Sequence, residues 1–294
     1  PTCTRWYARA PAPPARLKIL AFCLLALCLP ATADQRLFYQ PLNRDANVSP
    51  AQWQQLWHAT VAQGGKALIV QWSAYGDSDF GGAQGWLANS LRSARAQGLQ
   101  VVLGLYMDPA YYQRLDELDG EGLSSYWKAQ LGRSLTQYQQ LRQAWQLSVE
   151  GWYLPMELDD QHFRDPARRE ALFSQLQAFN RQLDKPLHIS AFSAGKLSPR
   201  VNAAWLDQLA GLGLTVWWQD GAGTGRLPPL VRQGYEQALP CRIGVVREAF
   251  RQVSAPGQVF RAEPTEPKLV GGCHLEAVFD LRYRPWAQGV LPQN

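Results

Sequence analysis

The chain has 294 residues, of which 29 are Lys or Arg and 24 are Asp or Glu, giving a formal net charge of +5. Four of the basic residues precede position 34, which leaves 25 basic and 24 acidic residues and a net charge of 25 − 24 = +1 for the remainder. A balance so close to neutral argues against nucleic-acid binding. The remaining stretch of about 260 residues is long enough for one large core.

The first segment has the order of features of a secretory signal peptide. Basic Arg16 and Lys18 precede an uncharged apolar run, Ile19 to Leu29, and Pro30 is then followed by the small residues Ala31-Thr-Ala33. The apolar run is too short to span a bilayer, and the pattern predicts cleavage before Asp34. We therefore expect residues 1–33 to be upstream residues plus a leader, and residues 34–294 to be periplasmic or secreted, without stable membrane insertion.

A lipid anchor is disfavoured, because the residue before Cys28 is Leu27 instead of a small residue.

Strand-like and helical patterns alternate along the rest of the chain. Helices are predicted at Ala51–Gln63, Ala167–Leu183 and Arg200–Leu209, each preceded by a capping Ser or Asp and a Pro. Apolar, β-branched and aromatic runs begin near Arg36, Lys66, Leu99, Val149, Pro186, Leu214, Cys241 and His274. Eight such units in this length predict a single α/β domain, a (β/α)8 TIM barrel over residues 34–294, although 251–270 lacks a regular pattern.

The fourth predicted strand, Gly151 to Asp160, ends in three carboxylates. Side chains alternate along a strand, so Tyr153 and Glu157 are expected on one face and Met156 on the other. Asp159 and Asp160 can be explained as caps of the next helix. Glu157 lies inside the apolar run and has no such explanation, so we expect it to be functional.

Other predicted strands also end in polar and aromatic residues, at the face where barrels carry their active sites. Flat aromatic rings beside carboxylates and amides suit a sugar, because C–H groups stack on rings and hydroxyls bind polar side chains. We expect substrate binding by Gln71, Trp72, Tyr75, Tyr106, Asp108, Asp159, Trp217, Trp218 and Gln219. Each strand-end Trp can equally be explained by packing in the core or barrel wall. Packing is expected for Trp53, Trp57, Trp127 and Trp145, which have helical spacing.

Glycoside hydrolysis needs two carboxyl groups across the scissile bond. Glu157, at the rim of an apolar and aromatic cavity, suits the acid/base role because burial raises the pKa of a carboxyl. The candidates for its partner are Glu248 first, Asp220 second and Glu276 third. Strands four and seven are nearly opposite in an eight-strand barrel, so Glu157 and Glu248 can face each other. The alternative for Glu248 is a surface position at the start of a helix.

Other chemistries have little support in the sequence. The four histidines, His58, His162, His188 and His274, show no metal-ligand spacing. No Gly-x-Ser-x-Gly elbow and no Gly-x-x-x-x-Gly-Lys phosphate loop is present. We therefore expect no metal and no cofactor.

Two cysteines, Cys241 and Cys273, remain after the leader. Each stands at the start of a predicted strand, the seventh and the eighth, which are neighbours in a closed barrel. In an oxidising compartment the two can form a disulfide. Two free thiols are the alternative.

Three motifs together resemble the family called domain of unknown function 4434. They are Gln71-Trp72 with Tyr75-Gly76, Gly151-Trp-Tyr-Leu-Pro155 with Glu157 and Asp159, and Gln219-Asp220-Gly221. The resemblance runs from about Arg36 to Glu248 and implies a glycoside-hydrolase-like barrel with a sugar-related site. The combined expectation is an exported glycosidase acting on a polysaccharide or oligosaccharide. The alternative is a non-catalytic barrel that binds an envelope polysaccharide or exopolysaccharide.

Overall fold

The computed structural model describes residues 35–255 and 257–293, which belong to one compact unit. The expected leader, residues 1–33, and the expected cleavage point before Asp34 lie outside the described residues. Among the described residues, no helix combines the length and the apolar character needed to cross a bilayer.

Eight parallel strands form a closed barrel in the order β1-β12-β9-β8-β7-β6-β4-β2, which confirms the predicted TIM-barrel fold. The barrel strands are β1 (Gln35–Tyr39), β2 (Gly65–Val70), β4 (Gln100–Gly104), β6 (Gly151–Asp159), β7 (Leu187–Phe192), β8 (Thr215–Gln219), β9 (Gly244–Glu248) and β12 (Glu276–Phe279). All eight predicted strands are present. The seventh and eighth begin a few residues later than their cysteines.

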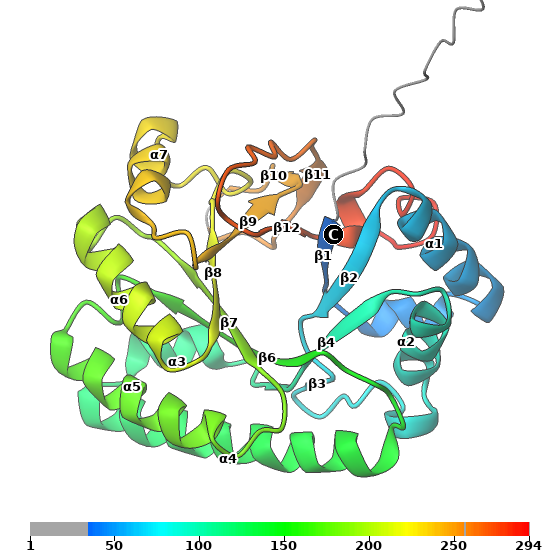
Figure 1. The fold of residues 1–294 in the computed structure, drawn as a ribbon, viewed down its shortest axis with the longest axis horizontal. Helices are drawn as coiled ribbons and strands as arrows, with labels where there is room; N and C mark the ends of the chain where they lie inside the picture. The colour runs from blue at the N-terminus through cyan, green and yellow to red at the C-terminus, as the bar shows by residue number, and fades with distance from the viewer. Residues whose placement is uncertain (1–34, 256, 294) are drawn as a thin grey trace, which may run out of the picture. The chain divides into compact units, whose positions relative to one another are not determined.

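Seven α-helices are described, and they lie outside the ring of strands (Figure 1). They are α1 (Pro50–Ala62), α2 (Trp86–Ala96), α3 (Tyr111–Glu117), α4 (Gly120–Ala144), α5 (Pro166–Asn180), α6 (Pro199–Gly211) and α7 (Pro229–Ala238). The predicted caps are present: Ser49, Asp165 and Ser198 each accept a hydrogen bond from a backbone amide of the first turn.

The connection between β9 and β12 departs from the regular barrel pattern. It contains the antiparallel hairpin of β10 (Phe250–Gln252) and β11 (Ala262–Pro264), and no α-helix among its described residues. Pro256, Gly257, Pro264 and Pro267 account for this, since both residue types disfavour a helix interior. The alternative that Glu248 begins a surface helix is therefore wrong: Glu248 ends strand β9.

Short elements complete the described part of the chain. A second small parallel pair, β3 (Ala74–Tyr75) and β5 (Tyr106–Met107), extends the carboxyl ends of β2 and β4. Three 3-10 turns are η1 (Asn43–Asn47), η2 (Gly82–Gln84) and η3 (Leu281–Tyr283).

The core has two apolar layers, one inside the barrel and one between the strands and the surrounding helices. The inner layer takes one residue from most barrel strands: Phe38, Ile69, Val102, Tyr153, Trp217, Val246 and Ala277. Strand β7 contributes Ser190, whose hydroxyl is hydrogen-bonded to the Tyr153 hydroxyl at 2.8 Å. The outer layer packs the strands against the helices and includes the four tryptophans expected in the core, Trp53, Trp57, Trp127 and Trp145.

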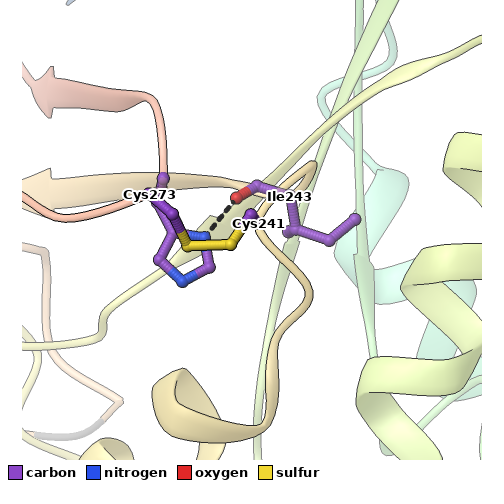
Figure 2. The surroundings of a disulfide bond; sticks show 4 residues. Cys241, Ile243 and Cys273 are labelled. Atoms are coloured by element: carbon purple, nitrogen blue, oxygen red, sulfur yellow. Dashed lines mark hydrogen bonds between the residues drawn. A yellow bond between two sulfur atoms is a disulfide. The ribbon is translucent and has the colours of Figure 1, made fainter.

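Cys241 and Cys273 form a disulfide across the amino-terminal side of β9 and β12 (Figure 2). Their Cα atoms are 5.2 Å apart, within the range that a disulfide requires. The imidazole Nδ1 of His274 lies 2.9 Å from the Ile243 carbonyl oxygen and adds a second link between the same two segments (Figure 2). The predicted pairing is confirmed, and the free-thiol alternative is wrong.

Candidate active site

A cavity of about 500 Å³ opens at the carboxyl ends of β6 to β9. It is walled by the last residues of these strands, by the loops that follow them, and by α3 and α7. Its lining includes Tyr112, Asp116, Glu157, Asp159, His162, Trp218, Gln219, Asp220, Gly221, Thr224, Arg226, Arg232 and Glu248. Carboxylates, amides and aromatic rings therefore share this space, at the end of the barrel that carries active sites in this fold.

Glu157 lies at the inner edge of the cavity because side chains alternate along β6. Tyr153 belongs to the barrel interior, whereas Leu154 and Met156 belong to the outer layer, so Glu157 follows Tyr153 on the inner face. The Tyr111 hydroxyl donates to the Glu157 carbonyl oxygen at 2.7 Å and fixes the backbone there.

Three side chains donate hydrogen bonds to the Glu157 carboxyl group. Gln219 Nε2 donates to Oε1 at 2.8 Å, and Gln71 Nε2 donates to the same atom at 3.4 Å. The Tyr112 hydroxyl donates to Oε2 at 2.6 Å. Burial raises the pKa of Glu157, and the hydrogen bonds from Tyr112 and Gln219 oppose that rise. Both oxygens thus have donors that favour the ionised form, although burial outweighs them and the net pKa of Glu157 is raised.

Glu248, at the end of β9, lines the same cavity in a different environment. Its Oε2 accepts hydrogen bonds from the backbone amides of Gly223, at 2.6 Å, and Thr224, at 3.3 Å. Burial, followed by the charge of Asp220, raises the pKa of Glu248 to about 7. No described residue donates a hydrogen bond to its Oε1, so this oxygen can carry a proton.

Glycine at position 223 permits the close approach that Glu248 requires. A Cβ atom at Gly223 would lie 2.6 Å from the Phe250 carbonyl oxygen. The glycine-rich loop after β8 therefore presents two amides to Glu248, a function that its sequence alone did not indicate.

Asp220 is placed to hold this loop against β9. Its Oδ1 accepts hydrogen bonds from the backbone amides of Ala222, at 3.0 Å, and Glu248, at 3.3 Å. Its Oδ2 lies 3.9 Å from the Arg247 guanidinium. Burial raises the pKa of Asp220, and these amides oppose the rise. Its carboxylate is occupied by these contacts, so it serves better to position Glu248 than to act on a substrate.

His162 was missed as a site residue because its sequence neighbours carry no motif. It bridges two carboxylates at the cavity wall, with Nδ1 2.7 Å from Asp159 Oδ2 and Nε2 2.8 Å from Asp116 Oδ1. Burial lowers the pKa of His162, but the hydrogen bonds to Asp159 and Asp116 outweigh it and the net pKa is raised. The bridge joins the end of β6 to α3, which carries Tyr112.

Tyr112 was also missed in the sequence. It lies on α3, six residues beyond the start of β5, and no strand-end pattern includes it. Arg226 and Arg232 line the cavity from the β8–α7 loop and from α7 itself. These residues could not be found from the sequence, because each belongs to a loop or helix that reaches the cavity only in the folded barrel.

The strand-end tryptophans do not form open sugar platforms. Trp217 is 1 % exposed in the barrel interior, where its Nε1 donates to His188 Nδ1 at 3.2 Å. Trp218 lines the cavity but is 2 % exposed, because its Nε1 donates to Ser193 Oγ and its ring stacks against Tyr235. Both tryptophans are therefore packing residues, and the expectation that a sugar stacks on their rings is not met.

Several other predicted binding residues have structural contacts instead. Tyr106 accepts a hydrogen bond from Arg133 on α4, and Asp108 accepts from the Tyr126 hydroxyl and the Ala110 amide. Neither lines the cavity. Asp159 does line it, but its carboxylate is taken by His162 and two backbone amides. These side chains shape the site without facing a ligand.

Glu276, the third candidate for the carboxyl pair, begins β12 and so lies at the opposite end of the strand from the cavity. Its Oε1 is 2.8 Å from Arg247 Nε, and two backbone amides donate to its oxygens. It is excluded from the site. Gln71 and Gln219, by contrast, contact Glu157 directly, while Trp72 and Tyr75 lie in a separate groove at the carboxyl ends of β1 and β2.

The described residues contain no group of three or more His, Cys, Asp or Glu side chains arranged to hold a metal ion.

Comparison with solved structures supports the fold. The chain is similar to a protein from Bacteroides thetaiotaomicron VPI-5482 named "putative alpha-L-fucosidase", with a TM-score of 0.53 and 13% identity. The match covers 94% of this chain and 99% of that chain. At this identity the similarity shows the barrel fold alone.

Two sequence comparisons agree with each other. The chain is 32% identical over 292 residues to the uncharacterized protein YbcH of Escherichia coli (strain K12), covering 92% of this chain and 98% of that protein. The model of the domain of unknown function DUF4434 matches residues 36–267, which run from the second residue of β1 past the end of β11 and include every residue that lines the cavity. The chain therefore belongs to the DUF4434 family.

Proposed function

We propose that this protein is a glycoside hydrolase that acts on a polysaccharide or oligosaccharide. The observation that supports this most directly is that Glu157 and Glu248 line one cavity with different hydrogen-bond donors: burial raises the pKa of both, but both oxygens of Glu157 accept hydrogen bonds, whereas only one oxygen of Glu248 does. A glycosidase needs one carboxyl group that is protonated and one that is ionised at the working pH.

Glu157 is suited to act as the ionised carboxylate. Both of its oxygens accept hydrogen bonds, from Gln219, Gln71 and Tyr112, and a donor to the charged form stabilises that form. In this role it attacks the anomeric carbon or activates a water molecule. The sequence predicted that Glu157 is the acid/base. Its hydrogen bonds instead favour the ionised role for Glu157, which leaves the acid role to Glu248.

Glu248 is suited to act as the general acid. A pKa of about 7 leaves it largely protonated at slightly acidic pH, and its Oε1 is free of donors among the described residues. It gives its proton to the glycosidic oxygen while the bond from that oxygen to the anomeric carbon breaks. Asp220 supports the role, because its negative charge helps to keep Glu248 protonated.

The test compares Glu157→Gln and Glu248→Gln on substrates that differ in their leaving group. For natural glycans, each variant should lower turnover by about 10²–10⁴. For aryl glycosides with an acidic phenol as leaving group, no proton is needed, so Glu248→Gln should retain most of its activity and Glu157→Gln should lose it. The matched control is Glu263→Gln, an exposed carboxylate on β11 that is paired with Arg251.

Two other outcomes are informative. The reverse pattern, with Glu157→Gln active on aryl glycosides, restores the acid/base role to Glu157. A wild-type protein that binds exopolysaccharides without cleaving any of them, and Gln variants that bind equally well, would replace the hydrolase with the non-catalytic carbohydrate-binding barrel.

A further inference from the structure

A second cavity, of about 250 Å³, lies at the carboxyl ends of β1 and β2, away from the strands that wall the first cavity. We call it the β1–β2 groove. It is lined by Gln40, Pro41, Leu42, Asn43, Trp72, Tyr75 and Phe80. None of these side chains is charged, and three of them are aromatic.

The aromatic wall of the groove is held rigidly. Trp72 Nε1 donates to the Pro41 carbonyl oxygen at 2.9 Å, and the ring of Tyr75 rests against that of Trp72 with centroids 4.8 Å apart. The Tyr75 backbone amide donates to the Ser78 carbonyl oxygen at 2.8 Å, and Tyr75 also lies in the β3–β5 pair. Nevertheless Tyr75 is 36 % exposed. A fixed ring with an open surface is suited to stacking on a ligand.

The β1–β2 groove is linked to Glu157 by a chain of side-chain amides. Gln40, which lines the groove, donates from Nε2 to Gln71 Oε1 at 2.9 Å. Gln71 in turn donates from Nε2 to Glu157 Oε1 at 3.4 Å. Two side chains therefore separate the groove from the carboxylate, while the first cavity lies on the other side, toward β7 to β9.

We propose that the β1–β2 groove is a subsite for a neutral sugar unit of the same glycan chain that is cleaved at Glu157. The inference rests on the proposed function. The substrate is then an oligosaccharide or polysaccharide whose chain crosses the barrel mouth from the groove to the cavity, and a single sugar is too short to use both. Tyr75 supplies a stacking face. Gln40 Nε2 already donates to Gln71 and Asn43 Oδ1 already accepts from Ser78 Oγ, and the remaining hydrogen-bonding capacity of these two amides binds hydroxyl groups.

The lining of the groove sets the chemical class of the sugar. A uronic acid or a sulfated sugar would place an anion where no lining residue offers a cation, and desolvation of that anion would be unfavourable. An uncharged pyranose has an apolar face for Tyr75 and hydroxyls for the amides.

The experiment measures how hydrolysis and binding depend on chain length. Size-graded cello-, chito- and malto-oligosaccharides and fragments of bacterial exopolysaccharides are compared with aryl monoglycosides, for wild type, Tyr75→Ala and Tyr75→Phe. For wild type, kcat/KM should rise with chain length until the groove is filled. Tyr75→Ala should lower kcat/KM about tenfold for the long substrates and leave the monoglycosides unchanged. Tyr75→Phe keeps the ring and should match wild type.

The same series is titrated onto Glu157→Gln with and without Tyr75→Ala, so that binding is read without cleavage. A loss of affinity confined to long chains supports the groove even if wild type proves not to be a hydrolase. Equal effects of Tyr75→Ala on long and short substrates, or affinity that does not change with chain length, would overturn the proposal that the groove is a subsite. The proposed roles of Glu157 and Glu248 would not be affected by that result.

Discussion

Glu157 and Glu248 illustrate how neighbouring groups give two identical carboxyl groups different chemistry. Glu157 lies near the end of an apolar strand but receives donors from three separate segments, on β8, α3 and the residue after β2. Glu248 receives two backbone amides on one oxygen only and stands beside the charge of Asp220. A pattern of residues along the chain can locate such groups, but their protonation depends on what surrounds them.

The raised pKa of Glu248 predicts a pH dependence of activity. If Glu248 donates a proton, kcat/KM on natural glycans should fall as pH rises through about 7. Glu248→Gln should remove this limb from the residual activity on natural glycans. A pH profile that is the same in both proteins would contradict the assignment.

The same pKa predicts a pH dependence of stability. Folding raises the pKa of Glu248 from its ordinary 4.5 to about 7, so between these values the folded state binds more protons than the unfolded state. The free energy of unfolding should therefore fall as pH rises through this window, by about 3 kcal/mol in total. Glu248→Gln should lack this loss, so that its stability relative to wild type is greater at pH 8 than at pH 4 in urea unfolding.

At the scale of the elements, close contact between β2 and β4 positions Gln71. Gly104 ends β4, and a Cβ atom there would lie 2.3 Å from the Gln71 carbonyl oxygen. The backbones are thus too close for any side chain at this position. This contact keeps the Gln71 amide within reach of Glu157.

Gly104→Ala should therefore impair both folding and the site. The added methyl forces the ends of β2 and β4 apart, which should lower the free energy of unfolding by about 3 kcal/mol and reduce turnover. The matched control is Gly132→Ala on α4, where a Cβ atom meets nothing within 4 Å. That change should raise stability by up to about 1 kcal/mol. Equal stabilities of the two variants in chemical denaturation would show that the close contact is not limiting.

At the scale of the whole molecule, the disulfide ties the irregular β9–β12 connection to the barrel. Cys241 and Cys273 are 32 residues apart in sequence, and the hairpin of β10 and β11 lies between them. Closing a loop of this length should contribute about 3–4 kcal/mol to the free energy of unfolding. Wild type should lose this amount when a reductant is added, and a double Cys→Ser variant should not respond. Detection of two free thiols in the denatured, unreduced protein would exclude the bond.

Export is the second prediction at this scale. A disulfide persists in oxidising compartments, and the sequence of residues 16–33 predicts a leader that would direct the chain to one. We expect the protein in a periplasmic fraction to begin at Asp34, as determined by N-terminal sequencing. Recovery with residues 1–33 intact, or with a lipid on Cys28, would contradict soluble export.

The barrel, its eight strands, the capped helices α1, α5 and α6, and the inward direction of Glu157 all followed from the sequence. These features depend on local periodicity, on turn residues and on alternation along a strand, which are properties of neighbouring residues. The partners of Glu157 and Glu248 did not follow, because Tyr112, Gln219, Gly223 and Gln71 meet these carboxyls only through closure of the barrel. Closure also decided that Trp217 fills the interior and that Tyr75 stays open to solvent, since burial is set by what packs across the barrel and not by the order of residues along a strand.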